Sequence, residues 1–453
     1  MVAHSLKTLF LIIVINHSVI PNSFAVESLL DIYQLALESD PDLKQVALSY
    51  DIAVEMKQQD LAQLLPSIRM SANITNNVQK RTYEVSQFDG EEDYNSQGYS
   101  LTLSQSLFRY ENTLRYKQAD QRIKQTNTEW NAAKQVLMIQ VSKRYFDILA
   151  AQDNLRFVTA EKQAIQRQLE QVTNRLEAGL SAITDLYETQ ARLDSTLASE
   201  IEAQNQFQNS LEALRQITNQ YHDKLAPLDK EQTFMPPTPS DIKHWESTAL
   251  QNNLEIMALR RNHERLRQEI DTQRAGHYPT LDLILSYSNS NSGGGNFGDS
   301  ETEDRTVGLQ LEMPIYQGGL IHSKTRTAQK TYSQHQEKLE STIRTVRTQT
   351  RESYLGVMAS MARVRALKQA IRSNNQALEA IQAGYNEGMR TTFDVLQVNR
   401  ELYRAQRDYQ RARYDYVLNR LQLKQSTGQL VESDLRQVNG YLAQRTIINT
   451  MDE

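Results

Sequence analysis

Two long stretches of the chain carry apolar residues at the spacing expected of coiled-coil helices. In the first, successive apolar positions lie seven, four, three and four residues apart, and in the second three, four, seven, three and four. This a/d pattern predicts helices that bury one narrow stripe against neighbouring helices while the other faces stay in water. The positions are Val158, Ile165, Leu169, Val172 and Leu176, followed by Val364, Leu367, Ile371, Leu378, Ile381 and Tyr385.

These helices are predicted to be very long because the chain around them lacks helix breakers. Proline is absent from residues 67–226, and Gly179 is the only glycine within residues 99–275. The stretch 111–178 alone would span roughly 100 Å, at ~1.5 Å per residue. A rod of this length suits a tube or an extended bundle rather than a compact globule, and a solid structural coiled coil remains the alternative.

Between the helical stretches, four short segments alternate strictly between apolar and polar residues. Alternation predicts β-strands, here with one apolar face and one face that carries Arg, Asp, Gln and Glu. A length of about nine to eleven residues suits tilted strands that cross a bilayer around a water-filled lumen, although a half-exposed soluble sheet would show the same pattern. The predicted strands are residues 67–76, 98–108, 279–288 and 305–315.

Four strands cannot close a barrel, and open edges are not tolerated in hydrocarbon because every backbone N–H and C=O needs a partner there. Sister copies must therefore close the sheet, either two with eight strands or three with twelve. Long polar loops are predicted at residues 76–97 and 288–304, on the outer side. The acidic cluster Asp89–Asp93 in the first loop is either solvated or a cation site.

The chain repeats itself after 209 residues. At this offset Gly179 falls on Gly388 and Asp185 on Asp394. Each half reads helix, strand, strand, very long helix, break at glycine, helix, which indicates a structural duplication. The predicted organisation is a first repeat at residues 26–233, a Pro-rich linker at 234–240, a second repeat at 241–430 and a C-terminal tail at 431–453.

The N-terminus and the composition narrow the function. Lys7, the apolar run Leu9–Ile15 and the small-x-small site ending at Ala25 predict a cleaved signal peptide at residues 1–25, with an uncleaved anchor as the alternative. The net charge is −5 and the basic residues are scattered, which argues against nucleic-acid binding. The chain has no cysteine, its eight histidines lack metal-site spacing, and no catalytic constellation is visible, so we expect neither a cofactor nor an enzyme.

Several segments resemble the outer-membrane efflux proteins typified by TolC, over nearly the whole mature chain. The segments are LLPSIRMSA, LTLSQSLF, RQLEQVTNRLEAGLSAITD, GHYPTLDL, LEMPIYQGG and AGYNEGMRTTFDVL. The resemblance implies a mainly α-helical homotrimer in the outer membrane, with a twelve-stranded β-barrel and a periplasmic barrel of coiled helices. It also implies an equatorial belt around that helical barrel, near the Pro-rich linker and the C-terminal tail. It also implies a periplasmic adaptor and an inner-membrane transporter, ATP-driven or proton-driven, as partners in drug efflux or type I secretion.

The two glycine breaks are predicted to lie at the periplasmic ends of the helices, where glycine permits a left-handed C-terminal turn. These tips are expected either to meet the adaptor or to be plain exposed turns. They comprise Gly179, Leu180, Ser181 and Ala182 in the first repeat, and Gly388, Met389 and Arg390 in the second.

Two roles are open for the acidic residues just beyond the glycine breaks. Asp185 and Asp394 could simply stabilise the first turn of a helix. By the resemblance, Asp394 would instead recur around the axis as a cation-attracting ring at the channel entrance. The family has a second acid three residues on, where this chain has Gln397, so the ring should be less negative unless Glu387 compensates.

The resemblance also assigns gate residues. Thr184, Asp185, Tyr385 and Arg390 match residues that, in the family, bond neighbouring helices and hold the entrance shut. The forked donor of Arg390 suits a carboxylate or a carbonyl. Tyr385 also continues the apolar seam, so a packing role is the alternative for it.

Overall fold

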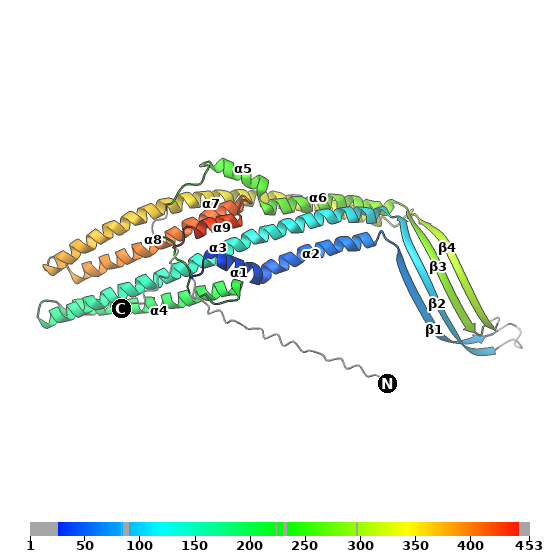
Figure 1. Cartoon of the computed structure of the whole chain (residues 1–453), viewed down its shortest axis with the longest axis horizontal. Coiled ribbons are helices and arrows are strands. Elements are labelled where there is room, and N and C mark those ends of the chain that lie inside the picture. Colours follow the sequence, from blue (N-terminus) through cyan, green and yellow to red (C-terminus); the bar gives the residue numbers. More distant parts are fainter. Residues whose placement is uncertain are drawn as a thin grey trace, which may run out of the picture.

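The molecule is a long helical rod with a β-sheet at one end (Figure 1). The computed structural model describes residues 26–82, 84, 90–222, 224–229, 233–295 and 298–443, so the predicted signal peptide and the end of the tail lie outside the described residues. No helix in these ranges is long and apolar enough to cross a membrane. The elements are α1 (Leu29–Ser39), α2 (Pro41–Ala62), β1 (Ser67–Arg81), β2 (Gly90–Phe108), α3 (Tyr110–Glu177), α4 (Ile183–Thr218), α5 (Ile242–Asn252), α6 (Leu254–Arg274), the 3-10 turn η2 (Ala275–His277), β3 (Thr280–Gly293), β4 (Asp299–Glu312), α7 (Leu320–Asn386), α8 (Thr392–Ser426) and α9 (Glu432–Asn439).

Two very long helices, α3 with 68 residues and α7 with 67, run from the sheet to the far end of the rod. Near the sheet, α2 and α6 lie beside α3, and α6 also packs on α7. Toward the far end, α3 pairs with α4 and α7 pairs with α8, which gives two helical hairpins (Figure 1). In α3 the predicted seam is buried at Val158, Ile165 and Val172. Ile165 clusters with Leu193 of α4 and Leu396 of α8. In α7 the two ends of the seam, Val364 and Tyr385, are buried, and the positions between them are half-buried.

The sheet is an antiparallel meander in the order β1-β2-β3-β4. Its apolar face is open to the surroundings: Ile68 of β1 is 69% exposed and Leu309 of β4 is 68% exposed. Within the described chain, β1 and β4 each pair on one side only, which leaves two open edges.

The predicted strand boundaries are wrong at the outer ends. The residues expected in the two long loops mostly continue the hairpin ladders: residues 76–81 pair with 90–95, and residues 289–293 pair with 299–303. Backbone pairing needs no hydrophobic side chains, so polar strand residues beyond the apolar band escape a pattern search. The fourth strand ends at Glu312 rather than at 315, because Pro314 cannot donate to a ladder.

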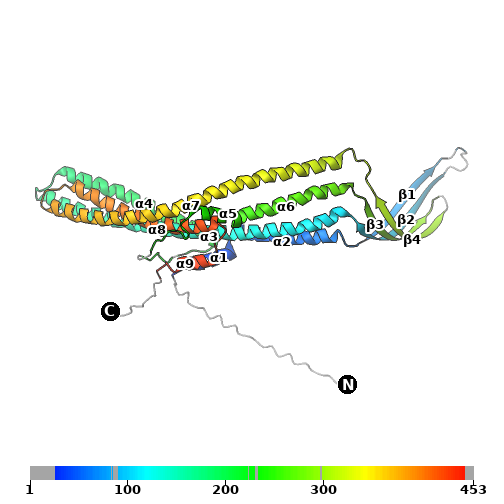
Figure 2. The same cartoon turned by 90° about the horizontal axis from the view of Figure 1, so that it is seen from above.

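A large apolar core lies at the middle of the rod. It joins α1 and α9, which lie together beside the rod (Figure 2), to the central part of α3 and the C-terminal part of α8. Aromatic residues fill it, with Phe146 of α3 stacked on Tyr414 of α8 at a centroid distance of 5.5 Å. The Pro-rich linker also reaches this core, where Tyr416 donates a hydrogen bond to the carbonyl of Met235 at 2.7 Å.

Candidate functional site

The two glycine breaks form matching turns at the end of the rod farthest from the sheet (Figure 1). Gly179 has φ +73° and Gly388 has φ +74°, the left-handed conformation that glycine adopts without strain. After the first glycine, the N–H of Leu180 donates to the Arg175 carbonyl at 2.7 Å, and after the second, the N–H of Met389 donates to the Gly384 carbonyl at 2.8 Å. Both are Schellman turns, which end a helix and satisfy its last carbonyls.

The acid that follows each turn caps the next helix. Asp185 accepts hydrogen bonds from the Ser181 hydroxyl at 2.7 Å and the Ala182 N–H at 3.3 Å. Asp394 accepts from the N–H of Thr391 at 3.0 Å and from its hydroxyl at 3.1 Å. These carboxylates therefore stabilise the first turns of α4 and α8, which is one of the two roles that the sequence predicts for them.

Capping does not remove the charge of Asp394. The backbone N–H and the hydroxyl of Thr391, and then the positive charge of Arg390, lower the pKa of this carboxyl below its usual value. Asp394 is consequently ionised at neutral pH. It also keeps its negative charge at a lower pH than an ordinary aspartate does. A capping role and a role in attracting cations are compatible at this position.

The predicted gate residues are only partly brought together within one copy. Tyr385 is 4% exposed, and the hydroxyl of Thr392 donates to its phenol oxygen at 3.5 Å. The guanidinium of Arg175, from α3, lies 5.0 Å from the centre of the Tyr385 ring and links the two hairpins at the tips. Thr184 is exposed, and Asp185 bonds to its own turn rather than to the other hairpin.

The position expected to weaken the acidic ring, Gln397, lies in a hollow of about 360 Å³ between α4 and α8. Its amide oxygen accepts a hydrogen bond from Arg400 at 2.6 Å. Glu387 is exposed at the end of α7. The sequence analysis missed Arg400, a positive charge that lies six residues after Asp394, nearly two turns further along α8.

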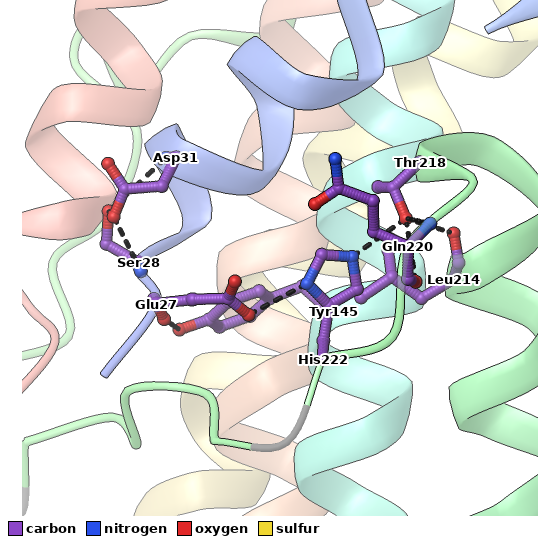
Figure 3. Close-up of polar contacts among 8 residues, drawn as sticks. All are labelled: Glu27, Ser28, Asp31, Tyr145, Leu214, Thr218, Gln220 and His222. Atoms are coloured by element: carbon purple, nitrogen blue, oxygen red, sulfur yellow. Dashed lines mark hydrogen bonds and ion pairs between the residues drawn. The ribbon is translucent and has the colours of Figure 1, made fainter. Parts of the chain in front are cut away.

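A second polar cluster lies at the middle of the rod (Figure 3). The carboxylate of Glu27 lies 2.7 Å from Nδ1 of His222, whose Nε2 lies 2.7 Å from the Thr218 hydroxyl. The phenol of Tyr145 donates to the Ala226 carbonyl at 2.8 Å and to the Glu27 carbonyl at 3.3 Å. These bonds fasten the segment before α1 to the segment after α4. We call Glu27, Thr218 and His222 the equatorial clasp.

The equatorial clasp has the carboxylate–imidazole–hydroxyl order of a hydrolase triad, but it is structural. Thr218 is fully buried, and its hydroxyl also contacts the backbone of Leu214 and Gln220. No substrate can reach it. The described residues hold no group of three or more metal-ligating side chains either. The sequence reading missed the clasp because Glu27 and His222 lie 195 positions apart.

Comparison with known proteins agrees with this architecture. The family model for outer membrane efflux proteins matches residues 32–220 and 245–429. The chain belongs to the outer membrane efflux protein family. It is 38% identical to the outer membrane protein TolC of Vibrio cholerae, over 92% of this chain and 94% of that protein. It is 30% identical to the alkaline protease secretion protein AprF of Pseudomonas aeruginosa, over 90% of this chain and 86% of that protein.

Solved structures show the same fold. The Campylobacter jejuni CmeC outer membrane channel superposes with a TM-score of 0.78 at 16% identity, over 92% of this chain and 90% of that chain. The predicted fold class, location and general function are confirmed. This outer membrane efflux protein is an outer-membrane exit duct of the kind used in efflux and type I secretion, and its helices extend into the periplasm. Its family is one of transport proteins rather than enzymes.

Proposed function

We propose that three copies of this chain form one continuous duct, with a twelve-stranded barrel in the membrane and a tunnel of helices below it. The open edges of β1 and β4 support this assembly, since unpaired backbone groups cannot face lipid. Three copies supply twelve strands and leave a pore, whereas eight strands fill their own interior with side chains. The duct passively conducts small molecules or proteins from the periplasmic side to the outside.

The duct works with two partners. A periplasmic adaptor meets the tips, where Leu180 is 68% exposed and Met389 is 76% exposed. Apolar side chains this open at the ends of a rod suit a protein partner. The adaptor couples the duct to an inner-membrane transporter of the ATP-driven or the proton-driven kind, which selects the cargo.

The entrance is gated at the tips. In the closed state, Tyr385, Arg390, Thr184 and Asp185 hold the α7–α8 hairpin against its neighbours, and opening moves this hairpin outward. The stacking of Arg175 on Tyr385 supports a latch here, since it joins the two hairpins of one copy at the tips. Around the axis, three copies of Asp394 attract cations to the closed entrance.

The gate is tested by conductance in planar bilayers. The protein is purified in detergent, and trimer formation is checked by comparing the migration of unheated and heated samples in SDS gels. Tyr385→Phe combined with Arg390→Ser is expected to raise the single-channel conductance, because the variant lacks two donors that hold the entrance shut. Tyr187→Phe is the matched control, since Tyr187 also lies near the tip but is 67% exposed.

Two results would contradict the proposal in different places. Unchanged conductance of the Tyr385 and Arg390 variant would refute the gate. A stable, water-soluble monomer without detergent would refute the duct itself.

A further inference from the structure

The two open edges of the sheet carry complementary residues at both ends. The basic residues Arg69 and Lys80 lie near the two ends of β1, and β4 carries Glu301 near its outer end and Glu312 at its inner end. We propose that β4 of one copy pairs with β1 of the next in a single register, with Glu312 opposite Arg69 and Glu301 opposite Lys80 of the neighbouring copy. This inference rests on the proposed assembly and defines the joint between its copies.

The faces of the two strands restrict the choice of register. The β1–β2 ladder runs without a shift from Ser67 to Arg81, and the β3–β4 ladder runs without a shift over all of β4. Strict alternation therefore places Lys80 on the apolar, lipid-facing side of β1 with Ile74, and Glu301 on the same side of β4 with Val307. Opposed residues share a face, so the register can change only in steps of two residues.

The apolar band then favours one register. In the proposed register, Met70, Ala72 and Ile74 of one copy lie opposite Leu311, Leu309 and Val307 of its neighbour. A slip of two residues in one direction would place Arg305 opposite Ile74, next to the lipid band. A slip in the other direction would place the polar Asn76 opposite Val307. Only the middle choice aligns both apolar bands along their whole length.

The second slipped register is a serious rival because the internal repeat points to it. Within one copy, Leu101 of β2 lies opposite Tyr287 of β3. In the strands the repeat departs slightly from 209 residues: residues 99–108 match 307–316, and residues 65–66 match 278–279. Carried over to these equivalent strands, the pairing would put Leu309 opposite Ile74. The charges argue against this transfer. In the β2–β3 joint, Asp282 forms an ion pair with Arg109 at 2.9 Å.

The repeat position of Asp282 is Arg69, and the repeat position of Arg109 is Gln317, so the ion pair has no direct equivalent between copies. In the rival register Arg69 would face Pro314, beyond the end of β4. In the proposed register it faces the carboxylate of Glu312, which restores an ion pair at the same level of the barrel. The charges at these positions therefore favour a β4–β1 register between copies that is shifted by two residues from the β2–β3 register within one copy.

The registers can be separated with engineered disulfides, because the chain contains no cysteine. Gln310→Cys is kept constant and combined with either Ser71→Cys or Asn73→Cys, all on the lumen side. The proposed register places residue 310 opposite 71, and the rival places it opposite 73. A slip of two residues moves the Cα atoms by about 7 Å, which takes a directly opposed pair out of disulfide range.

After oxidation of outer membranes, the Ser71 pair is expected to give covalent oligomers in heated SDS samples, at several-fold higher yield than the Asn73 pair. A higher yield from the Asn73 pair would overturn the proposal in favour of the repeat register. Absence of cross-links from both pairs, in protein that still migrates as a heat-dissociable trimer, would overturn β4–β1 pairing in either register. If the unsubstituted protein, which has no cysteine, does not form a trimer, the proposed assembly itself is refuted.

The ion pair at the lumen side has its own test. Arg69→Glu alone and Glu312→Arg alone are each expected to lower the temperature at which the trimer dissociates in SDS. The double variant should regain part of that loss, because the charges are exchanged and still opposed. Equal losses that simply add in the double variant would show that these two side chains are not neighbours.

Discussion

The turn that follows α8 offers a direct test of how tightly the middle of the rod is packed. Gly428 has φ +70° and forms the same Schellman turn as the tip glycines, with the N–H of Gln429 donating to the Lys424 carbonyl at 2.9 Å. Unlike the tips, it lies against another backbone: a Cβ added at Gly428 would sit 2.1 Å from the carbonyl oxygen of Asn252. The matched control is Gly179, which has φ +73° and no atom within 4 Å of an added Cβ.

The expected magnitudes follow from this difference. An alanine at either position must adopt the left-handed conformation, which costs about 1–2 kcal/mol. At Gly428 the overlap also forces the backbone apart, and overpacking of this kind costs about 1–3 kcal/mol more. The shift also disturbs a buried polar contact, the amide of Asn253 donating to the Ser426 carbonyl at 2.9 Å. We therefore expect Gly428→Ala to lower the free energy of unfolding by about 2–5 kcal/mol and Gly179→Ala by about 1–2 kcal/mol.

The assay is denaturant unfolding of the full-length protein in detergent, followed by the loss of helical circular dichroism. Both variants are compared with the unsubstituted protein under identical conditions, so that detergent effects cancel. Equal destabilisation by the two substitutions would refute the reasoning, because it would show that the contact with Asn252 imposes no constraint.

Three further outcomes are expected. Asp394→Asn should weaken the block of conductance by multivalent cations; in the unsubstituted protein the block should persist as the pH falls below the usual aspartate range, because the pKa of Asp394 is lowered. Tyr414→Phe should cost about 1–3 kcal/mol of folding free energy, because it removes a 2.7 Å hydrogen bond to the half-buried carboxylate of Asp153. Burial raises the pKa of Asp153, so this loss should be largest at neutral pH and shrink as the carboxyl is protonated. His222→Phe should cost about 1–3 kcal/mol in the same unfolding assay by breaking the equatorial clasp.

Each of these outcomes has a result that contradicts it. Unchanged cation block in Asp394→Asn would leave only the capping role for that carboxylate. A loss in Tyr414→Phe that does not vary with pH would show that Asp153 does not carry a charge at neutral pH. Equal stability of His222→Phe and the unsubstituted protein would show that the clasp residues are replaceable by packing alone.

The long helices were predictable because their signal is local and repeated. The predicted stretch 111–178 differs by one residue at each end from α3, since an extended breaker-free run and a terminal glycine define such a helix from sequence alone. The same holds for the tips, because the left-handed turns at Gly179 and Gly388 demand a residue type that stands out in the chain.

The features that the sequence did not reveal depend on contacts between distant segments. The outer halves of the strands carry mostly polar residues on both faces, so only the hairpin ladder shows that they are strands. The equatorial clasp joins the region before α1 to the region after α4, and nothing in the local sequence of His222 indicates its partner. The bond from Arg400 to Gln397 depends on the side-chain conformations of α8, which the sequence pattern does not give.

The open edges of the sheet have a genetic consequence. A copy whose helices fold but whose β1 or β4 edge pairs badly can still be recruited by sound copies, because they too lack partners until the ring closes. When such a variant is produced from a second gene in the same cell, it should prevent the ring from closing in most of the assemblies that it enters. Edge mutations in this protein should therefore be dominant over the normal allele, whereas mutations that abolish folding of the whole chain should be recessive.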